Sequence, residues 1–189
     1  GKPANYKIKT YGRIVPERYD DFAWENDKLA FRMYGAALDN RPDNAKGIDL
    51  WLKRTSSLVI NKWYKLNDYH VDHGEGLDAY NVGITLGSGN SAPITDSGLV
   101  FSDNYNDYKI LDLGPLRISF QLIYKPWKVN GKIVSQVKTI TLDAGSNLNK
   151  ITDKYNFESN SLNIGEGITK HKDDGSPVTD SSSVFLSYW

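Results

Sequence analysis

The sequence of 189 residues contains no cysteine, so it can form neither a disulfide framework nor a metal site with thiolate ligands. Long apolar runs are also missing, because no stretch approaches the roughly 18 residues that a membrane-spanning helix needs. The chain is long enough to bury a core of its own. We therefore expect one domain, residues 1–189, with no membrane span.

Net charge is absent as well. Lysine and arginine total 23, and aspartate and glutamate total 23. Such a chain has no overall field that would attract nucleic acid or an acidic membrane. We expect no nucleic-acid partner.

Several sequence motifs of common enzymes are missing too. There is no GxSxG elbow, Walker loop, dinucleotide fingerprint or EF-hand pattern, which disfavours serine hydrolase, nucleotide and nicotinamide chemistry. The sequence starts at Gly1 without an initiator methionine or a signal-like apolar stretch. We interpret this start as the result of removing a signal segment, and expect a periplasmic or extracellular protein.

Aromatic residues are abundant in a polar chain. They make up 12% of the sequence, with twelve tyrosines and five tryptophans, while the mean hydropathy is −0.52. A pyranose stacks its C–H face on a flat ring while its hydroxyls form hydrogen bonds. This combination favours a carbohydrate-binding surface.

Alternating apolar and polar residues predict strands along most of the chain. The first hairpin is expected over residues 22–34, with its turn at Asn26 and Asp27, and a further strand over residues 47–54. The return strand of this hairpin and the strand over residues 47–54 each have one aliphatic face and one face with rings and charges. In one sheet, they would place Arg32, Tyr34, Asp49, Trp51 and Lys53 on a common surface. The alternative is a solvated outer face that has no binding role.

The remaining pattern predicts a short helix over residues 57–66, a strand over 81–86 and a long surface connection over 87–98. An antiparallel meander should follow, with strands over 105–112, 116–124, 132–142, 147–157 and 162–170. Asn130-Gly131 is a strong turn signal, because both central residues of a type I′ turn need positive φ. After a loop over residues 173–183, a final strand from Val184 stops at Trp189 and suggests a truncated C-terminus. The aliphatic register predicts six core residues: Leu29, Phe31, Leu50, Leu52, Ile118 and Phe120.

Ionisable residues are densest in the loop 68–78, which contains His70 and His73 among Asp72, Glu75 and Asp78. Imidazoles with carboxylates suit a transition metal, and carboxylates alone suit calcium. A histidine beside carboxylates also suits acid–base catalysis near neutral pH. The third interpretation is structural, with the aspartates forming turn hydrogen bonds.

Three segments of the sequence resemble a known family. They are residues 18–35 (RYDDFAWENDKLAFRMYG), 47–54 (GIDLWLKR) and 69–78 (YHVDHGEGLD), and they resemble the domain-of-unknown-function family numbered 4861. The resemblance implies an exported protein of polysaccharide-degrading bacteria. It also implies an all-β fold, a large antiparallel β-sandwich of the galactose-mutarotase-like supersandwich type.

We therefore expect a domain that acts on or binds plant or algal glycans as a lyase or a glycoside hydrolase, or else a non-catalytic carbohydrate-binding module. A lyase needs a cation for the uronate carboxylate and a tyrosine or histidine base. A hydrolase needs two carboxyl groups across the bond, from Asp27, Asp49, Glu75 or Asp78. The catalytic candidates are His70, His73, Glu75, Arg32 and Tyr34. The substrate-binding candidates are Trp24, Asp49, Trp51, Lys53 and Asp78. No cofactor is expected, although a divalent cation remains an alternative.

Overall fold

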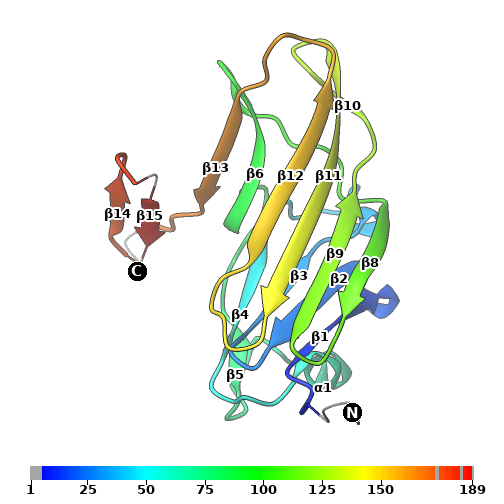
Figure 1. Ribbon diagram of the computed structural model, residues 1–189, viewed down its shortest axis with the longest axis vertical. Coiled ribbons are helices and arrows are strands. Elements are labelled where there is room, and N and C mark those ends of the chain that lie inside the picture. Colours follow the sequence, from blue (N-terminus) through cyan, green and yellow to red (C-terminus); the bar gives the residue numbers. More distant parts are fainter. Residues whose placement is uncertain (1–5, 173–174, 184, 189) are drawn as a thin grey trace, which may run out of the picture.

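The computed structural model describes residues 6–172, 175–183 and 185–188, and it forms an all-β sandwich (Figure 1). Antiparallel sheets dominate, as the alternating pattern predicts. The first sheet has its strands in chain order: β1 (Thr10–Val15), β2 (Asp21–Asn26), β3 (Leu29–Met33), β4 (Asp49–Lys53) and β5 (Gly76–Asp78).

The second sheet packs in front of the first in the view of Figure 1. In this sheet β8 pairs with β9, both β9 and β10 pair with one edge of β11, and β12 pairs with the other edge of β11. Its strands are β8 (Asp107–Leu113), β9 (Arg117–Ile123), β10 (Trp127–Val129), β11 (Lys132–Asp143) and β12 (Lys150–Phe157).

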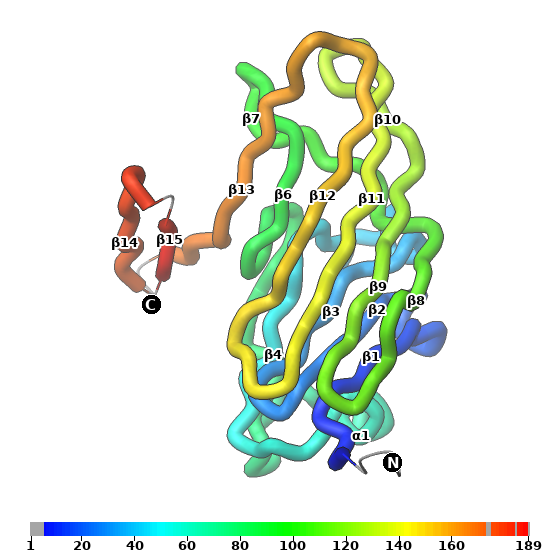
Figure 2. The backbone as a smooth tube through the Cα atoms, viewed as in Figure 1, coloured from blue at the N-terminus to red at the C-terminus, as the bar shows by residue number. Residues whose placement is uncertain are grey.

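Shorter elements complete the fold, and Figure 2 traces their connections. A third sheet has the order β13-β6-β7, and a hairpin of β14 and β15 stands apart from the sandwich. These elements are η1 (Pro16–Arg18), η2 (Ala36–Leu38), α1 (Ile60–Leu66), β6 (Ser88–Thr95), β7 (Gly98–Leu99), β13 (Ile164–Ile168), β14 (Pro177–Asp180) and β15 (Phe185–Tyr188).

The first sheet is covered on both of its faces. Its front face packs against the second sheet, where Phe22 stacks on Phe120 with ring centroids 4.1 Å apart. Its rear face packs against α1 and the loop after it, where the ring of Trp51 stacks on Trp63 and Tyr69. All six residues of β2 are therefore buried.

Most of the predicted elements are present. The strands of the first hairpin, the helix, the Asn130-Gly131 turn and the strands of the meander up to residue 157 are confirmed. Asn130 and Gly131 have φ angles of 49° and 77°, as a type I′ turn requires. We call the core between the first and second sheets the front core, and the core between the first sheet and α1 the rear core. Five of the six predicted core residues pack in or against the front core. The prediction that Leu52 belongs to the core is wrong: its side chain lies on the predicted face, but the residue is 47% exposed near the end of β4.

Residues 81–98 differ most from the prediction. The expected strand over 81–86 is a series of bends, and the expected loop over 87–98 contains β6. The last strand of the expected meander, β13, pairs with β6 and not with β12. A segment rich in serine, glycine and asparagine becomes a strand here through pairing with residues more than seventy positions away, which local periodicity does not encode. Of the loop expected over 173–183, residues 177–180 form β14, while Val184 and Trp189 lie outside the described residues.

Candidate functional site

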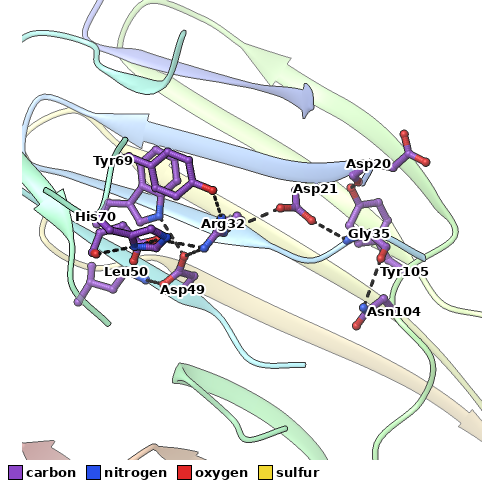
Figure 3. A network of polar contacts seen from close by, with 12 residues as sticks. Asp20, Asp21, Arg32, Gly35, Asp49, Leu50, Tyr69, His70, Asn104 and Tyr105 are labelled. Carbon is purple, nitrogen blue, oxygen red and sulfur yellow. Dashed lines mark hydrogen bonds and ion pairs between the residues drawn. The ribbon is translucent and has the colours of Figure 1, made fainter. Parts of the chain in front are cut away.

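Arg32 on β3 is the centre of a buried polar network on the rear face of the first sheet (Figure 3). Its Nη2 atom donates to Asp49 Oδ2 at 2.5 Å and to Asp78 Oδ2 at 3.0 Å. Its Nη1 atom donates to the Tyr69 hydroxyl at 3.4 Å, and its Nε atom lies 3.9 Å from Asp21 Oδ2. The side chain of Arg32 is 5% exposed, and those of the three aspartates are at most 2% exposed.

Strand register brings these groups together. Arg32 pairs with Asp49 across β3 and β4, and Asp78 on β5 pairs with Trp51 on β4. The guanidinium carbon of Arg32 also lies 5.0 to 5.6 Å from the ring centroids of Tyr34, Trp51 and Tyr69. The cation is thus enclosed by rings and carboxylates.

The network contains more acids than bases. Three aspartates surround one guanidinium, which gives a net charge of −2 when all four groups are ionised. Such a charge is costly away from water, and this cost raises the pKa of two of the three carboxyl groups, Asp21 and Asp78. Burial raises the pKa of Asp21 to about 7. Burial, together with the charge of Asp49, raises the pKa of Asp78 to about 6.

His70 lies directly against Asp78. Its Nδ1 atom is 3.1 Å from the carbonyl oxygen of Asp78 and 3.5 Å from Asp78 Oδ2. Because a carbonyl oxygen only accepts hydrogen bonds, Nδ1 carries the hydrogen, and Nε2 of the neutral ring can accept a proton. The side chain of His70 is 64% exposed, so this nitrogen is accessible.

Asp78 and His70 line a cavity of about 490 Å³, which we call the Arg32 cavity. Its volume falls in the usual range for small-molecule sites. Polar side chains from separate parts of the chain form its wall. The lining residues are Arg18, Arg32, Tyr34, Pro42, Asp43, Asn44, Ala45, His70, Asp78, Ala79, Tyr80, Asn81, Val82 and Gly83.

Contacts between distant residues hold the loops of this wall. The Asn104 side chain donates to Asn44 Oδ1 at 2.9 Å and to the Gly35 carbonyl at 3.3 Å. In the segment 79–83, the Tyr80 hydroxyl donates to the Thr169 carbonyl at 3.0 Å, and His171 Nε2 lies 2.8 Å from the Asn81 carbonyl oxygen. Residues near the end of the described chain therefore help to shape the cavity.

Comparison with known proteins identifies the family of this chain. The family described as domain of unknown function (DUF4861) matches residues 2–189. The chain belongs to this family.

One curated relative is 37% identical to the chain over 201 residues, the "Uncharacterized protein P7" of Formosa agariphila. The alignment covers all of this chain but 50% of the relative, so the DUF4861 chain spans half the length of the relative that it matches. No solved structure matches the chain, and the galactose-mutarotase-like topology therefore stays a prediction.

The structure brings four of the sequence-predicted site residues of this DUF4861 chain to one cavity: Arg32, Tyr34, His70 and Asp78. Asp49 contacts Arg32 from behind the cavity wall and accepts a hydrogen bond from Trp51 Nε1 at 3.0 Å. Asp49 and Trp51 do not line the cavity, although they share a sheet face with Arg32.

Other candidates have no access to a ligand at this cavity. Trp24 and Trp51 are fully buried, in the front and rear cores respectively, so neither ring has a free face for a sugar. The Lys53 side chain is fully buried in an ion pair with Glu25 at 2.7 Å. The rear face of the first sheet is covered by α1 and the loop 67–75, which bury Trp51, and the front face is covered by the second sheet, which buries Trp24. The stacking role expected of these two tryptophans is therefore wrong for this structure.

The rest of loop 68–78 has structural contacts. His73 Nε2 lies 3.0 Å from Asp68 Oδ2, and Glu75 pairs with Lys62 at 2.8 Å. Asp72 Oδ1 accepts the backbone N–H groups of Gly74 and Gly76, as the structural interpretation of the loop expects. Asp27, a candidate for hydrolase chemistry, accepts the Gly145 N–H far from the cavity wall.

Sequence reasoning missed Arg18, Asn44 and Asn81 as cavity residues. Asn44 and Asn81 lie in irregular segments whose positions depend on contacts distant in sequence, and Arg18 is the last residue of η1. Among the described residues, no group of three or more histidines, aspartates or glutamates is placed to hold a metal ion. Within the same residues, no helix is long and apolar enough to cross a membrane.

Proposed function

We propose that this domain binds an oligosaccharide in the Arg32 cavity and transfers protons on it through Asp78 and His70. The observation that carries the proposal is the contact of these two groups on the wall of a polar cavity, together with the pKa of Asp78 at about 6. A carboxyl group that gains and loses its proton near neutral pH is suited to general acid–base catalysis.

The cavity wall supports a sugar as the ligand. Tyr34, Asn44, Tyr80 and Asn81 contribute hydroxyl and amide groups beside the apolar Val82 and Pro42. Sugars present hydroxyls and C–H faces, and both kinds of group find complements here. Because polysaccharides are too large to enter a cell intact, export to the periplasm or the medium is part of this proposal.

Elimination fits these residues better than hydrolysis. Hydrolysis needs two carboxyl groups facing the glycosidic bond. Asp43 and Asp78 are the carboxyls of the cavity lining, and Asp43 already accepts a hydrogen bond from Arg41 Nε at 2.9 Å. In elimination, a base removes the proton beside the uronate carboxylate, its electrons form a C=C bond, and the departing oxygen takes a proton from an acid. His70 and Asp78 would serve as this base and acid.

The test compares His70→Ala with His73→Ala on a panel of uronate and neutral oligosaccharides. Both histidines lie in the same loop, but His73 is bound to Asp68 and does not line the cavity. We expect His70→Ala and Asp78→Asn to lower turnover about 100-fold or more, and His73→Ala to keep it. Absorbance of unsaturated products distinguishes elimination from the new reducing ends of hydrolysis.

Thermal unfolding of each variant is the control for loss of fold. Folded His70→Ala and Asp78→Asn variants with full turnover would exclude the acid–base role. Binding of a glycan without any turnover would instead identify a carbohydrate-binding module, and the absence of both would overturn the proposal.

A further inference from the structure

The charged groups that line the Arg32 cavity differ in how far they are neutralised. Arg32 is bound by Asp49 and Asp78, Asp78 also contacts His70, and Asp43 is bound by Arg41. Arg18 has a different environment. Among the described residues, its guanidinium has no hydrogen bond or ion pair, and its Nε atom is buried without a hydrogen-bond partner.

A second cation lies beside Arg18. The guanidinium carbons of Arg18 and Arg41 lie 5.4 Å and 4.2 Å from the centroid of the same ring, that of Tyr19. The charge of Arg18 favours the ionised forms of Asp43 and Asp21, although neither carboxylate binds it and Asp43 is bound by Arg41. Among the described residues, no carboxylate forms an ion pair with Arg18, whereas Arg41 is paired with Asp43.

The backbone around Arg18 is held in an unusual conformation. Arg18 ends η1, and Tyr19 and Asp20 follow with φ angles of 54° and 60°. Two successive non-glycine residues in the left-handed region are strained. The Tyr105 hydroxyl donates to the Asp20 carbonyl, and a Cβ atom at Gly35 would come within 2.2 Å of that same oxygen. These close contacts fix the backbone from which Arg18 reaches the cavity.

We propose that Arg18 binds an anionic group of the sugar, a carboxylate or a sulfate, and thereby selects acidic glycans. A guanidinium without an internal partner matches either oxyanion through paired N–H donors. This inference rests on the proposed function, because it assigns the substrate class of the same cavity. In the elimination described above, Arg18 would neutralise the carboxylate, which Arg32 cannot do while three aspartates surround it.

The test uses matched pairs of ligands. Each uronate oligosaccharide of a panel is paired with its carboxyl-reduced counterpart, which has the same ring and linkage without the charge, and with a sulfated form of that counterpart. Calorimetry measures the affinity of wild type, Arg18→Gln and Arg18→Lys for each member. Arg117→Gln is the control, because Arg117 is an exposed arginine on β9 that pairs with Asp143 and does not line the cavity.

We expect wild type to bind a charged member more tightly than its neutral counterpart. Arg18→Gln should weaken the charged member by about 10- to 100-fold, the usual effect of losing a hydrogen bond to a charged group. The affinity of Arg18→Gln for the neutral counterpart should change by less than about 3-fold. The affinity of Arg18→Lys for the charged member should lie between those of wild type and Arg18→Gln. Preference for the uronate or for the sulfated form identifies the source of the anionic group.

Two results would overturn the inference, and they differ in what they say of the proposed function. Equal binding of charged and neutral members, or an equal effect of Arg18→Gln and Arg117→Gln, would remove the role of Arg18 while the cavity remains a glycan site. Absence of binding by the entire panel would remove the proposed function and this inference together.

Discussion

Asp21 is fully buried, and the environment of its two carboxylate oxygens differs. Oδ1 accepts the Gly35 N–H at 3.1 Å, whereas Oδ2 has no hydrogen-bond partner and lies 3.9 Å from Arg32 Nε. The free-energy cost of burying the Asp21 charge exceeds the electrostatic stabilisation from Arg32 at this distance. The pKa of Asp21 is therefore raised to about 7 from an ordinary value of 3.8.

This raised pKa predicts a loss of stability with increasing pH. Between about pH 4 and pH 7 the unfolded chain releases the Asp21 proton while the folded chain retains it, so the free energy of unfolding falls across this window. The full effect is about 4 kcal/mol. Asp21→Asn removes the titration and keeps an acceptor for Gly35. We expect the variant to gain stability relative to wild type from pH 4 to pH 7, measured by urea unfolding, with a constant difference above about pH 8.

Other carboxyl groups titrate in the same experiment. Asp72 and Glu75, for example, have lowered pKa values because of hydrogen bonds to glycine N–H groups and to Lys62 respectively, and they make the folded chain more stable as pH rises through the acid range. Only the difference between variant and wild type isolates Asp21. A difference that does not change between pH 4 and pH 7 would contradict the assignment.

At the scale of elements, α1 is a helix of seven residues that has no side-chain cap of its own. Its start is bound instead by Glu25 on β2, whose carboxylate accepts the N–H groups of Val59 at 2.8 Å and Ile60 at 2.9 Å. The same carboxylate pairs with the buried Lys53. One side chain thus connects the helix to two strands of the first sheet.

Glu25→Gln tests this connection. The amide keeps one acceptor but leaves the Lys53 ammonium buried without a counter-charge, so we expect a loss of about 3–5 kcal/mol in the free energy of unfolding. Glu17→Gln is the matched control, because Glu17 pairs with Arg13 on the surface and should cost less than about 1 kcal/mol. Chemical denaturation measures both. Equal losses in the two variants would show that Glu25 has no special role.

Periodicity in the sequence predicted most of these elements but not how they cover one another. The alternation of Arg32 and Asp49 with aliphatic residues correctly predicted a shared polar face. It did not show that Trp51 on that face would be covered by α1, because the same alternation describes a solvated face and a face buried under aromatic residues. Arg18 reaches the cavity from a backbone segment whose Asp20 carbonyl contacts Gly35 and Tyr105, and no local pattern encodes contacts so distant in sequence.

At the scale of the molecule, the first sheet belongs to two cores. Phe22 and Trp24 on β2 pack in the front core, while Ala23 between them packs in the rear core. Residues of β3 alternate in the same way, with Phe31 in front and Ala30 behind. Loss of the central strands would therefore expose both cores at once.

This shared sheet predicts a single cooperative unfolding transition. Trp24 and Trp127 belong to the front core, and Trp51 and Trp63 to the rear core. Trp189 is the fifth tryptophan and is replaced by phenylalanine in both variants. Two variants can then each keep the reporters of one core: one adds Trp51→Phe and Trp63→Phe, and the other adds Trp24→Phe and Trp127→Phe. In each variant we expect the midpoint from tryptophan fluorescence to equal the midpoint from far-ultraviolet circular dichroism. The substitutions will lower stability, so each comparison is made within one variant. If the rear-core tryptophans report a lower denaturant midpoint than circular dichroism of the same variant, then α1 and the wall of the Arg32 cavity unfold before the sandwich, and the two faces of the first sheet are not one cooperative unit.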